Sequence, residues 1–184
     1  MKQHLLSLLL ATALLGACGG KTAPPVSTAG ENDYALENTS PDGILRMQPY
    51  HFSDTVRTDG HTYVYTLHRE ASDSLPTVSD DEGNRYADNV YTLTISSGDQ
   101  TVFQRRFTKQ AFAAYLSAEF LKKGVLDGMM CDKSLPGLRF AVSVSLPQSD
   151  MFEPLLMQVD THGGIIISRD ERGEAEFEDN GDGV

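Results

Sequence analysis

The chain has 184 residues, of which 40% are hydrophobic, 26 are acidic and 15 are basic, giving a formal net charge of −11. This length suits one domain with flexible ends, because a domain typically contains about 100–200 residues. The charge argues against nucleic acid as a partner, since phosphate binding needs clustered Lys and Arg. It also disfavours adhesion to anionic lipid through a basic face, so membrane attachment would have to be covalent or hydrophobic.

Residues 1–17 have the pattern of an export signal peptide. Lys2 gives the positive start, an apolar run of eleven residues follows at Leu5–Leu15, and small residues precede Cys18. A transmembrane helix needs about 20 apolar residues, so this run is too short to span a membrane as a mature element. Removal of residues 1–17 takes away Lys2 and no acid, which leaves 14 basic and 26 acidic residues and a net charge of −12.

The segment Leu15-Gly16-Ala17-Cys18 resembles the bacterial lipobox, which has a Leu, two small residues and a Cys. The resemblance implies attachment of a diacylglycerol to the Cys18 sulfur and cleavage before Cys18. Each buried acyl carbon contributes about 0.8 kcal/mol, so two or more chains anchor a protein stably. We therefore expect a lipoprotein of the cell envelope, anchored by its lipid to the outer membrane. The alternative is a simple secretory signal with a chance Cys.

Both ends of the chain are expected to be flexible. Residues 18–41 are rich in small and polar residues, contain Pro24-Pro25 and show no apolar periodicity, which is typical of a tether. Residues 169–184 hold seven acids and two bases, which predicts a solvated acidic tail. Residues 42–168 between them are expected to form a single β-rich domain.

The first half of this domain predicts two hairpins. Asp59-Gly60 is a tight-turn dipeptide, and the β-branched and aromatic run His61–His68 follows it. Residues Gln48–Arg57 can pair back across that turn. In the second hairpin, Val90–Ser96 pairs with Thr101–Phe107.

The hydrophobic period then changes to that of a helix. Thr108 is a candidate cap, and a break is possible near Ser117. Lys122-Lys123 suit the negative end of a helix dipole, and Gly124 suits a left-handed stop. The apolar positions at helical spacing are Phe112, Tyr115, Leu116 and Phe120.

The chain returns to strands after this helix. Leu138–Leu146 alternates apolar and polar residues, which predicts an antiparallel strand with one face in the core. Leu155–Val159 and Gly164–Ser168 predict two more strands, and Gly124–Asp132 a further extended segment. The expected fold is α+β, mainly antiparallel, with about seven or eight strands in a sandwich or half-barrel and one amphipathic helix.

Few residues predict chemistry. The histidines of the domain match no metal-ligand spacing, and His61 and His68 should point to opposite faces of one strand. The acidic loop Ser79–Asn84 could hold Ca²⁺, but its spacing matches no defined calcium loop, which favours a solvated connection. Asp88-Asn89 precedes a strand, which favours a turn-forming role through side-chain hydrogen bonds to the backbone.

The cysteine count gives one further expectation. If Cys18 carries lipid, Cys131 has no intramolecular partner and the domain contains no disulfide. Cys131 should then be a small buried apolar residue, with a catalytic nucleophile as the sharper alternative. No motif for a nucleophile elbow, a zinc protease or a phosphate loop occurs in the sequence. We therefore predict no catalytic residue, no cofactor and no metal ligand.

Four blocks of the sequence resemble a family of uncharacterised Bacteroidetes lipoproteins, which is classed only as a domain of unknown function. The resemblance implies a Gram-negative envelope lipoprotein and assigns no catalytic or binding residue. Gly19-Gly20-Lys21-Thr22 lacks the acidic residues that often follow the lipidated Cys of surface-displayed lipoproteins, so the periplasmic face of the outer membrane is favoured. The four blocks are Arg85–Ile95, Phe107–Phe112, Phe120–Lys133 and Leu138–Gly164.

The leading hypothesis is a non-catalytic binding or structural module that binds an envelope protein, a peptide or a glycan in the periplasm. The alternative is a small-ligand carrier, in which a curved sheet encloses an apolar pocket as lipocalin-like barrels do. A third hypothesis is an enzyme whose His or Cys131 meets a carboxylate inside a concave site. The carrier hypothesis depends on the aromatic residues Tyr63, Tyr65, Phe103 and Phe140.

Overall fold

The computed structural model describes residues 41–172, and this part of the chain forms eleven β-strands, one 3₁₀-helix (η1) and one α-helix (α1). The strands make two four-stranded antiparallel sheets and one small three-stranded sheet. The first sheet contains β2 (Tyr50–Thr58), β3 (His61–Ala71), β6 (Asn89–Ser97) and β7 (Gln100–Phe107). The second contains β8 (Val125–Cys131), β9 (Leu138–Ser145), β10 (Phe152–Val159) and β11 (Ile165–Arg169). The small sheet contains β1 (Ile44–Leu45), β4 (Val78–Ser79) and β5 (Arg85–Tyr86).

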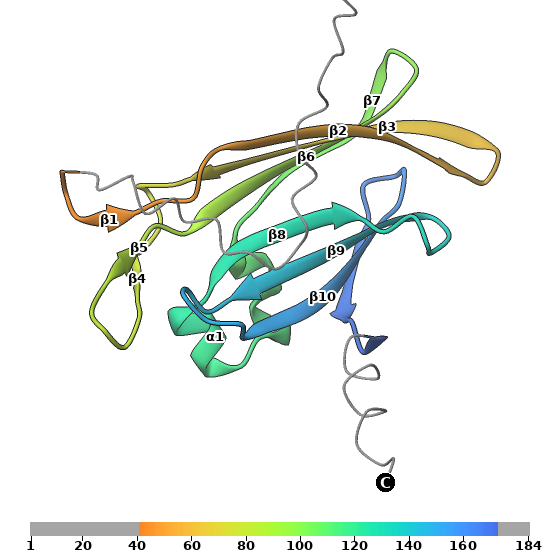
Figure 1. Ribbon diagram of the computed structural model, residues 1–184. Coiled ribbons are helices and arrows are strands. Elements are labelled where there is room, and N and C mark those ends of the chain that lie inside the picture. Colours follow the sequence, from red (N-terminus) through yellow and green to blue (C-terminus); the bar gives the residue numbers. More distant parts are fainter. Residues whose placement is uncertain (1–40, 173–184) are drawn as a thin grey trace, which may run out of the picture.

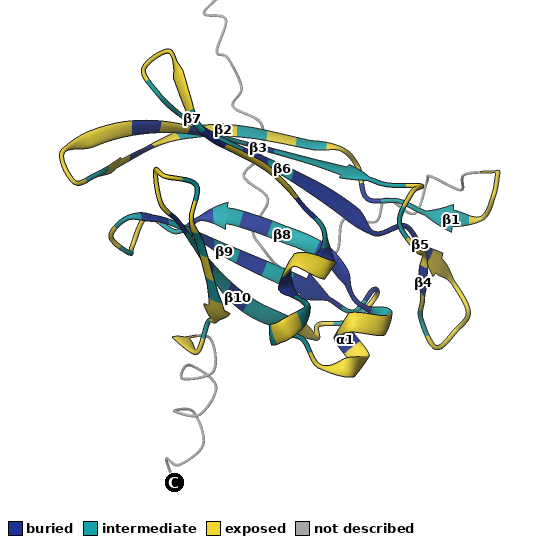
Figure 2. Ribbon diagram, turned by 180° about the vertical axis from the view of Figure 1, so that it is seen from behind, coloured by how far each residue is buried: buried dark blue, intermediate teal, exposed yellow. Residues whose placement is uncertain are grey.

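The two larger sheets stack face to face as a sandwich, and they do not close into a barrel (Figure 1). Their strand orders are β2-β3-β6-β7 and β11-β10-β9-β8, and β6 and β8 bring the two sheets closest together. The core lies between them, where the rings of Tyr65 and Phe140 meet edge to face with centroids 5.7 Å apart. Figure 2 shows a long buried stretch on β6, buried residues interspersed with partly buried ones on β8, and exposed residues at the hairpin tips. The expected mainly antiparallel sandwich is confirmed.

Local sequence explains the two predicted hairpins, and both are confirmed. Asp59 and Gly60 have φ angles of 51° and 75°, so both adopt the left-handed conformation that a two-residue hairpin turn requires. The register runs from Thr58 opposite His61 to Tyr50 opposite Arg69. In the second hairpin, β6 pairs with β7 with one irregularity in the register. The alternating strand from Leu138 is also confirmed, as β9.

The strand count and the helix differ from the expectation. Eleven strands in the described residues exceed the predicted seven or eight, because the two-residue strands β1, β4 and β5 carry too little pattern to be recognised. The single expected helix is two helices, η1 (Lys109–Tyr115) and α1 (Ala118–Lys123). They are separated at Leu116 and Ser117, which both have extended backbone, and the Ser117 side chain caps α1 by accepting a hydrogen bond from the Phe120 N–H. Thr108 makes no side-chain cap bond.

Gly124 ends α1 for a different reason from the predicted one. Its φ is −76°, so it does not adopt the left-handed stop conformation. A Cβ at this position would lie 2.6 Å from the Phe120 carbonyl oxygen and 2.8 Å from Cγ1 of Val144. Glycine is therefore needed because the chain passes very close to α1 and β9 where it enters β8.

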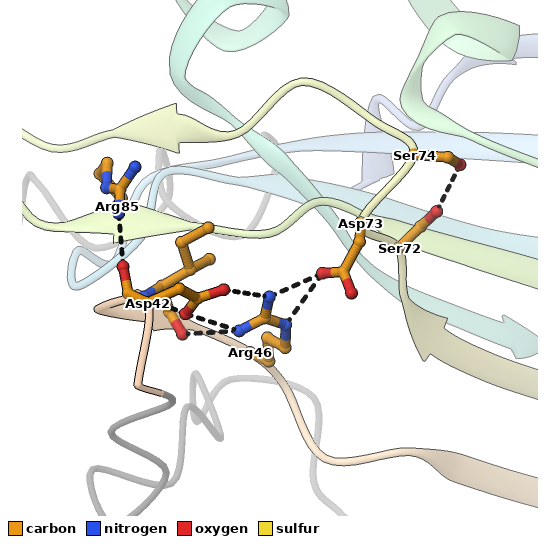
Figure 3. A network of polar contacts seen from close by, with 7 residues as sticks. Asp42, Arg46, Ser72, Asp73, Ser74 and Arg85 are labelled. Atoms are coloured by element: carbon orange, nitrogen blue, oxygen red, sulfur yellow. Dashed lines mark hydrogen bonds and ion pairs between the residues drawn. The ribbon is translucent and has the colours of Figure 1, made fainter.

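The small sheet fixes the beginning of the described chain against the rest of the domain. Arg46 lies between two carboxylates, 2.8 Å from Asp42 and 2.7 Å from Asp73, and Arg85 donates to the Asp42 carbonyl (Figure 3). A second apolar cluster underlies this network and includes Met47 and Val125. These contacts hold the segment before β2 beside the start of β8.

Candidate functional site

Strand β8 is an edge strand of the second sheet, and the first sheet covers its free side. An edge strand leaves backbone N–H and C=O groups without ladder partners, and burial of such groups is costly unless they are hydrogen-bonded. Here five side chains from the first sheet and the segments beside it supply the partners. We call these side chains and the β8 backbone that they bind the β8 seam. They are Arg69, Asp88, Asn89, Tyr91 and Lys109.

A buried ion pair lies at the start of the β8 seam. Asp88 accepts hydrogen bonds at Oδ1 from the backbone N–H of Leu126, at 2.9 Å, and from that of Asn89, at 2.8 Å. The Lys109 ammonium donates to the Gly124 carbonyl and lies 3.5 Å from Oδ2 of Asp88. The two residues are only 5% and 9% exposed. Each charge therefore has an opposite charge and a backbone partner, which offsets its removal from water.

Asn89 continues the seam two residues further along the chain, at Leu126. It is completely buried, and its Nδ2 donates to the Leu126 carbonyl at 3.0 Å and contacts Sδ of Met47 at 3.1 Å. The Leu126 backbone is thus held on both sides, its N–H by Asp88 and its C=O by Asn89. These two bonds replace the ladder bonds that a neighbouring strand would have made.

Two side chains bind the carbonyl of Asp127. The Arg69 guanidinium donates to it at 3.0 Å, and the Tyr91 hydroxyl donates to it at 2.7 Å. Arg69 also donates to the Gln48 carbonyl at 3.1 Å and lies over the Tyr50 ring, 5.7 Å from its centroid. The planar guanidinium can serve two carbonyls and a ring at once, which a lysine could not do. Burial raises the pKa of Tyr91 to about 12, so its hydroxyl keeps its proton and remains a donor.

Asp127 is the extra residue of a β-bulge. The register passes from Leu126 opposite Val144 to Gly128 opposite Ser143, so Asp127 has no partner on β9. Its carboxylate accepts a hydrogen bond from the Ser143 hydroxyl at 2.8 Å. Burial raises the pKa of this carboxyl, although the hydroxyls of Ser145 and Ser143 and the charge of Arg69 oppose the rise. The bulge turns the Asp127 carbonyl toward Arg69 and Tyr91.

With this geometry established, the comparisons with known proteins place the chain in a family. A family model described as a domain of unknown function (DUF4738) matches residues 29–167. The chain belongs to the DUF4738 family. The match includes every residue of the β8 seam. The expected membership of a family classed as a domain of unknown function is confirmed. No curated protein matches the chain.

The structure tests the prediction for one of the two cysteines, Cys131. Cys18 lies outside the described residues, so its lipidation stays a prediction. Cys131 is a free, buried residue of β8 in the DUF4738 domain, as expected. Burial raises the pKa of its thiol to about 11, which keeps it protonated and unreactive at neutral pH. This supports the interpretation of Cys131 as a small core residue.

The acidic loop of the DUF4738 domain is organised by one aspartate. Asp80 accepts from the backbone N–H groups of Glu82 at 3.0 Å and Asn84 at 2.9 Å, and from the Tyr86 hydroxyl at 2.8 Å. These bonds explain the loop as a structured turn. Within residues 41–172, no three or more His, Cys, Asp or Glu side chains are grouped so that they could hold a metal ion. In the same range, no helix is long and apolar enough to cross a membrane.

Several residues of the β8 seam were not recognised in the sequence. Asp88-Asn89 was assigned a turn-forming role, and the Asp88 bond to the Asn89 N–H fits it, but the pair is buried and holds β8. Arg69 and Lys109 gave no signal, since an isolated basic residue has no recognisable spacing. Asp127-Gly128, within an otherwise apolar strand, could have indicated the bulge.

The aromatic residues on which a ligand pocket would depend belong to the core. Tyr63, Tyr65, Phe103 and Phe140 are all buried in one cluster between the sheets. They fill the sandwich together with aliphatic side chains of both sheets. The lipocalin-like barrel is therefore not the architecture of the DUF4738 domain.

Proposed function

We propose that this protein is a lipoprotein of a Gram-negative Bacteroidetes envelope, anchored through Cys18 to the periplasmic face of the outer membrane. Its DUF4738 domain acts as a non-catalytic module that binds an extended segment of another envelope protein. The lipobox Leu15-Gly16-Ala17-Cys18 supports the anchor. The tether that the sequence predicts between Cys18 and the described domain has about 22 residues, and a flexible chain of that length would have a root-mean-square reach of about 25 Å.

The observation that carries the binding role is an apolar surface on the second sheet. Five large apolar side chains are exposed in the described part of the chain, and three of them lie here: Met151 at 54%, Phe152 at 52% and Ile166 at 67%. Pro154 and Leu156 alternate with inward-facing residues of β10 and are half-buried. We call Met151, Phe152, Pro154, Leu156 and Ile166 together the β10–β11 surface. Exposed apolar patches of this kind mark contact sites for other molecules.

The edge of the sheet favours an extended partner. Strand β11 is the last strand in the order β11-β10-β9-β8, and no further strand pairs with it in residues 41–172. An extended peptide can add to such an edge through backbone hydrogen bonds, while alternate side chains give specificity. Ile166 would then contact an apolar residue of the partner. The net charge of −11 favours a partner segment that carries Lys or Arg.

The β8 seam supports a role without catalysis. Its buried charges, Asp88 and Lys109, are bound to each other and to backbone groups of Leu126 and Gly124. Arg69 is bound to the carbonyls of Asp127 and Gln48. These interactions give each charged group a role in holding the two sheets together.

The anchor is tested by replacing its cysteine. Cys18→Ala should leave an uncleaved precursor that incorporates no labelled fatty acid, while the matched variant Cys131→Ala should be labelled like the wild type. Labelling that persists in Cys18→Ala would refute the lipid attachment.

The binding role is tested with two synthetic eight-residue peptides, one alternating Ile with Lys and the other alternating Ile with Glu. The Lys peptide should bind the protein, and Ile166→Lys should weaken binding at least tenfold by placing a like charge at the contact. Val64→Lys is the matched control, because Val64 is 42% exposed on the first sheet. Equal binding of both peptides, or equal loss in both variants, would contradict strand addition at β11.

A further inference from the structure

Two histidines face each other across neighbouring strands of the first sheet. His51 on β2 and His68 on β3 are directly opposite in the register, and their ring centroids are 6.2 Å apart with the planes inclined at 56°. The next pair along the strands, Phe52 and Leu67, points to the core, so the two imidazoles project from the outer face. His51 is exposed and His68 is half-buried, which leaves both rings accessible to solvent.

This pairing suits a chelate. Directly opposite residues of an antiparallel pair have Cβ atoms about 4.5–5.5 Å apart. A metal bound by imidazole lies about 2.0–2.1 Å from the ligating nitrogen, so small side-chain rotations would bring both rings onto one ion. Neither backbone segment would need to move, because the hairpin register already holds the pair together. Imidazole nitrogen is a good ligand for Cu²⁺, Ni²⁺ and Zn²⁺.

The surroundings permit a cation. Thr92 on β6 lies opposite His68 and presents no charge. Arg106 on β7 lies opposite Thr92, and its guanidinium is paired with Glu70 at 3.3 Å, which offsets its positive charge. The net charge of −11 attracts cations over the whole molecule. Because no third His, Cys, Asp or Glu in residues 41–172 completes a cluster, the pair would act as a two-ligand chelate with its other positions open.

We propose that His51 and His68 form a binding site for a divalent transition metal on the outer face of the first sheet. The site is independent of the β10–β11 surface, which lies on the other sheet. Its affinity should follow the order Cu²⁺ > Ni²⁺ and Cu²⁺ > Zn²⁺, as imidazole ligands generally do. Binding should weaken as the pH is lowered, because protons compete with the metal ion for the imidazole nitrogens.

The test uses the purified full chain without a polyhistidine tag, titrated with CuCl₂, NiCl₂ and ZnCl₂ and followed by calorimetry and by NMR of the histidine rings. One Cu²⁺ per chain should shift or broaden the ring signals of His51 and His68 together. His51→Gln and His68→Gln should each weaken Cu²⁺ binding at least tenfold, and the double variant should lose little more, since one ring alone cannot chelate.

Matched controls are His61→Gln and His162→Gln, which lie at a hairpin turn and at an exposed turn of the second sheet. Both should bind Cu²⁺ like the wild type. The denaturant midpoint of each metal-free variant checks that the fold is intact, and Cu²⁺ should raise this midpoint only where both His51 and His68 are present. Cu²⁺ affinity that survives the double variant, or that falls equally in the controls, would overturn the proposal.

Discussion

The two edge strands of the second sheet, β8 and β11, have opposite surroundings. At β8, side chains from the first sheet and the segments beside it bind the backbone of Gly124, Leu126 and Asp127. At β11, no strand follows in the described residues, and Ile166 is 67% exposed. The two strands are the opposite edges of one four-stranded meander. They differ in what lies beside their free side, which is the first sheet at β8 and no further strand of the described residues at β11. One edge is closed by this protein's own side chains, and the other presents an apolar residue to its surroundings.

This difference shows how side-chain hydrogen bonds can join the two sheets of a sandwich without a further paired strand. One side of β8 pairs with β9. On its other side, Arg69 and Asn89 bind the β8 backbone in the place that a further strand would take. Burying charged side chains there is costly, and leaving the buried backbone groups of β8 without hydrogen bonds would also be costly. A closed β8 edge also cannot pair with another chain, so strand addition to the second sheet is directed to β11.

The largest effect is expected from breaking the buried ion pair of the β8 seam. Lys109→Met removes the positive charge and the bond to the Gly124 carbonyl, and leaves Asp88 buried without its partner. Loss of one member of a buried pair typically costs about 3–5 kcal/mol. Denaturant unfolding should therefore show a lowered free energy of unfolding, and the exposed control Lys122→Met should change it by less than about 0.5 kcal/mol.

A second substitution separates the charge from the packing. In the Lys109→Met background, Asp88→Asn removes the unpaired charge while its oxygen can still accept from the Leu126 N–H. The double variant should be more stable than Lys109→Met alone, and the measured coupling should exceed about 1 kcal/mol. If the two substitutions are simply additive, the pair does not act as a unit and the seam owes its stability to packing.

A middle-sized effect is expected at the entrance to β8. Gly124→Ala would place a Cβ 2.6 Å from the Phe120 carbonyl oxygen and 2.8 Å from Cγ1 of Val144. Both neighbours are firmly held, one being backbone and the other a fully buried side chain. Overpacking of this kind costs about 1–3 kcal/mol, which denaturant unfolding would measure.

On the open edge, Ile166→Thr should change the unfolding free energy by less than about 0.5 kcal/mol, and a larger loss there would mean that β11 is covered in the free protein.

The parts of this fold that could be predicted are the local ones. Asp59-Gly60 fixes a turn and a register, and the alternation from Leu138 to Ser145 fixes which side chains face the core. The same turn register places residue 51 opposite residue 68, so the histidine pair could have been found by counting outward from the turn. It was missed because the histidines were compared by their separation in the sequence alone.

The β8 seam could not be predicted in this way, because its bonds join distant parts of the chain. Asp88 and the Leu126 N–H are 38 residues apart, and Arg69 and the Asp127 carbonyl are 58 apart. Nothing local relates a lone Arg on a strand to a carbonyl of another sheet. The two-residue strands β1, β4 and β5 could not be predicted for a related reason. Their pairing depends on contacts with Arg46 and Val125 and not on a pattern within each strand.

The smallest effect concerns the carboxyl of Asp127 and depends on pH. Burial raises its pKa in the folded protein above the ordinary unfolded value of about 3.9, so the folded state favours the protonated form. Its contribution to stability is present below the unfolded pKa and is lost as the pH rises through the folded pKa. Asp127→Asn carries no charge at any pH and can still accept from Ser143. The free energy of unfolding of the variant should therefore rise relative to that of the wild type as the pH rises.

Unfolding by denaturant at several pH values between 3 and about 7 measures this difference. Taking the difference from the wild type removes the opposite contributions of Asp80, Asp132 and Asp160, whose pKa values are lowered in the folded protein. If Asp127→Asn instead loses stability as the pH rises, the carboxylate is ionised in the fold and Arg69 stabilises its charge. Asp127 would then belong to the charge pairing of the β8 seam, and the bulge would add a second ion pair to the closed edge.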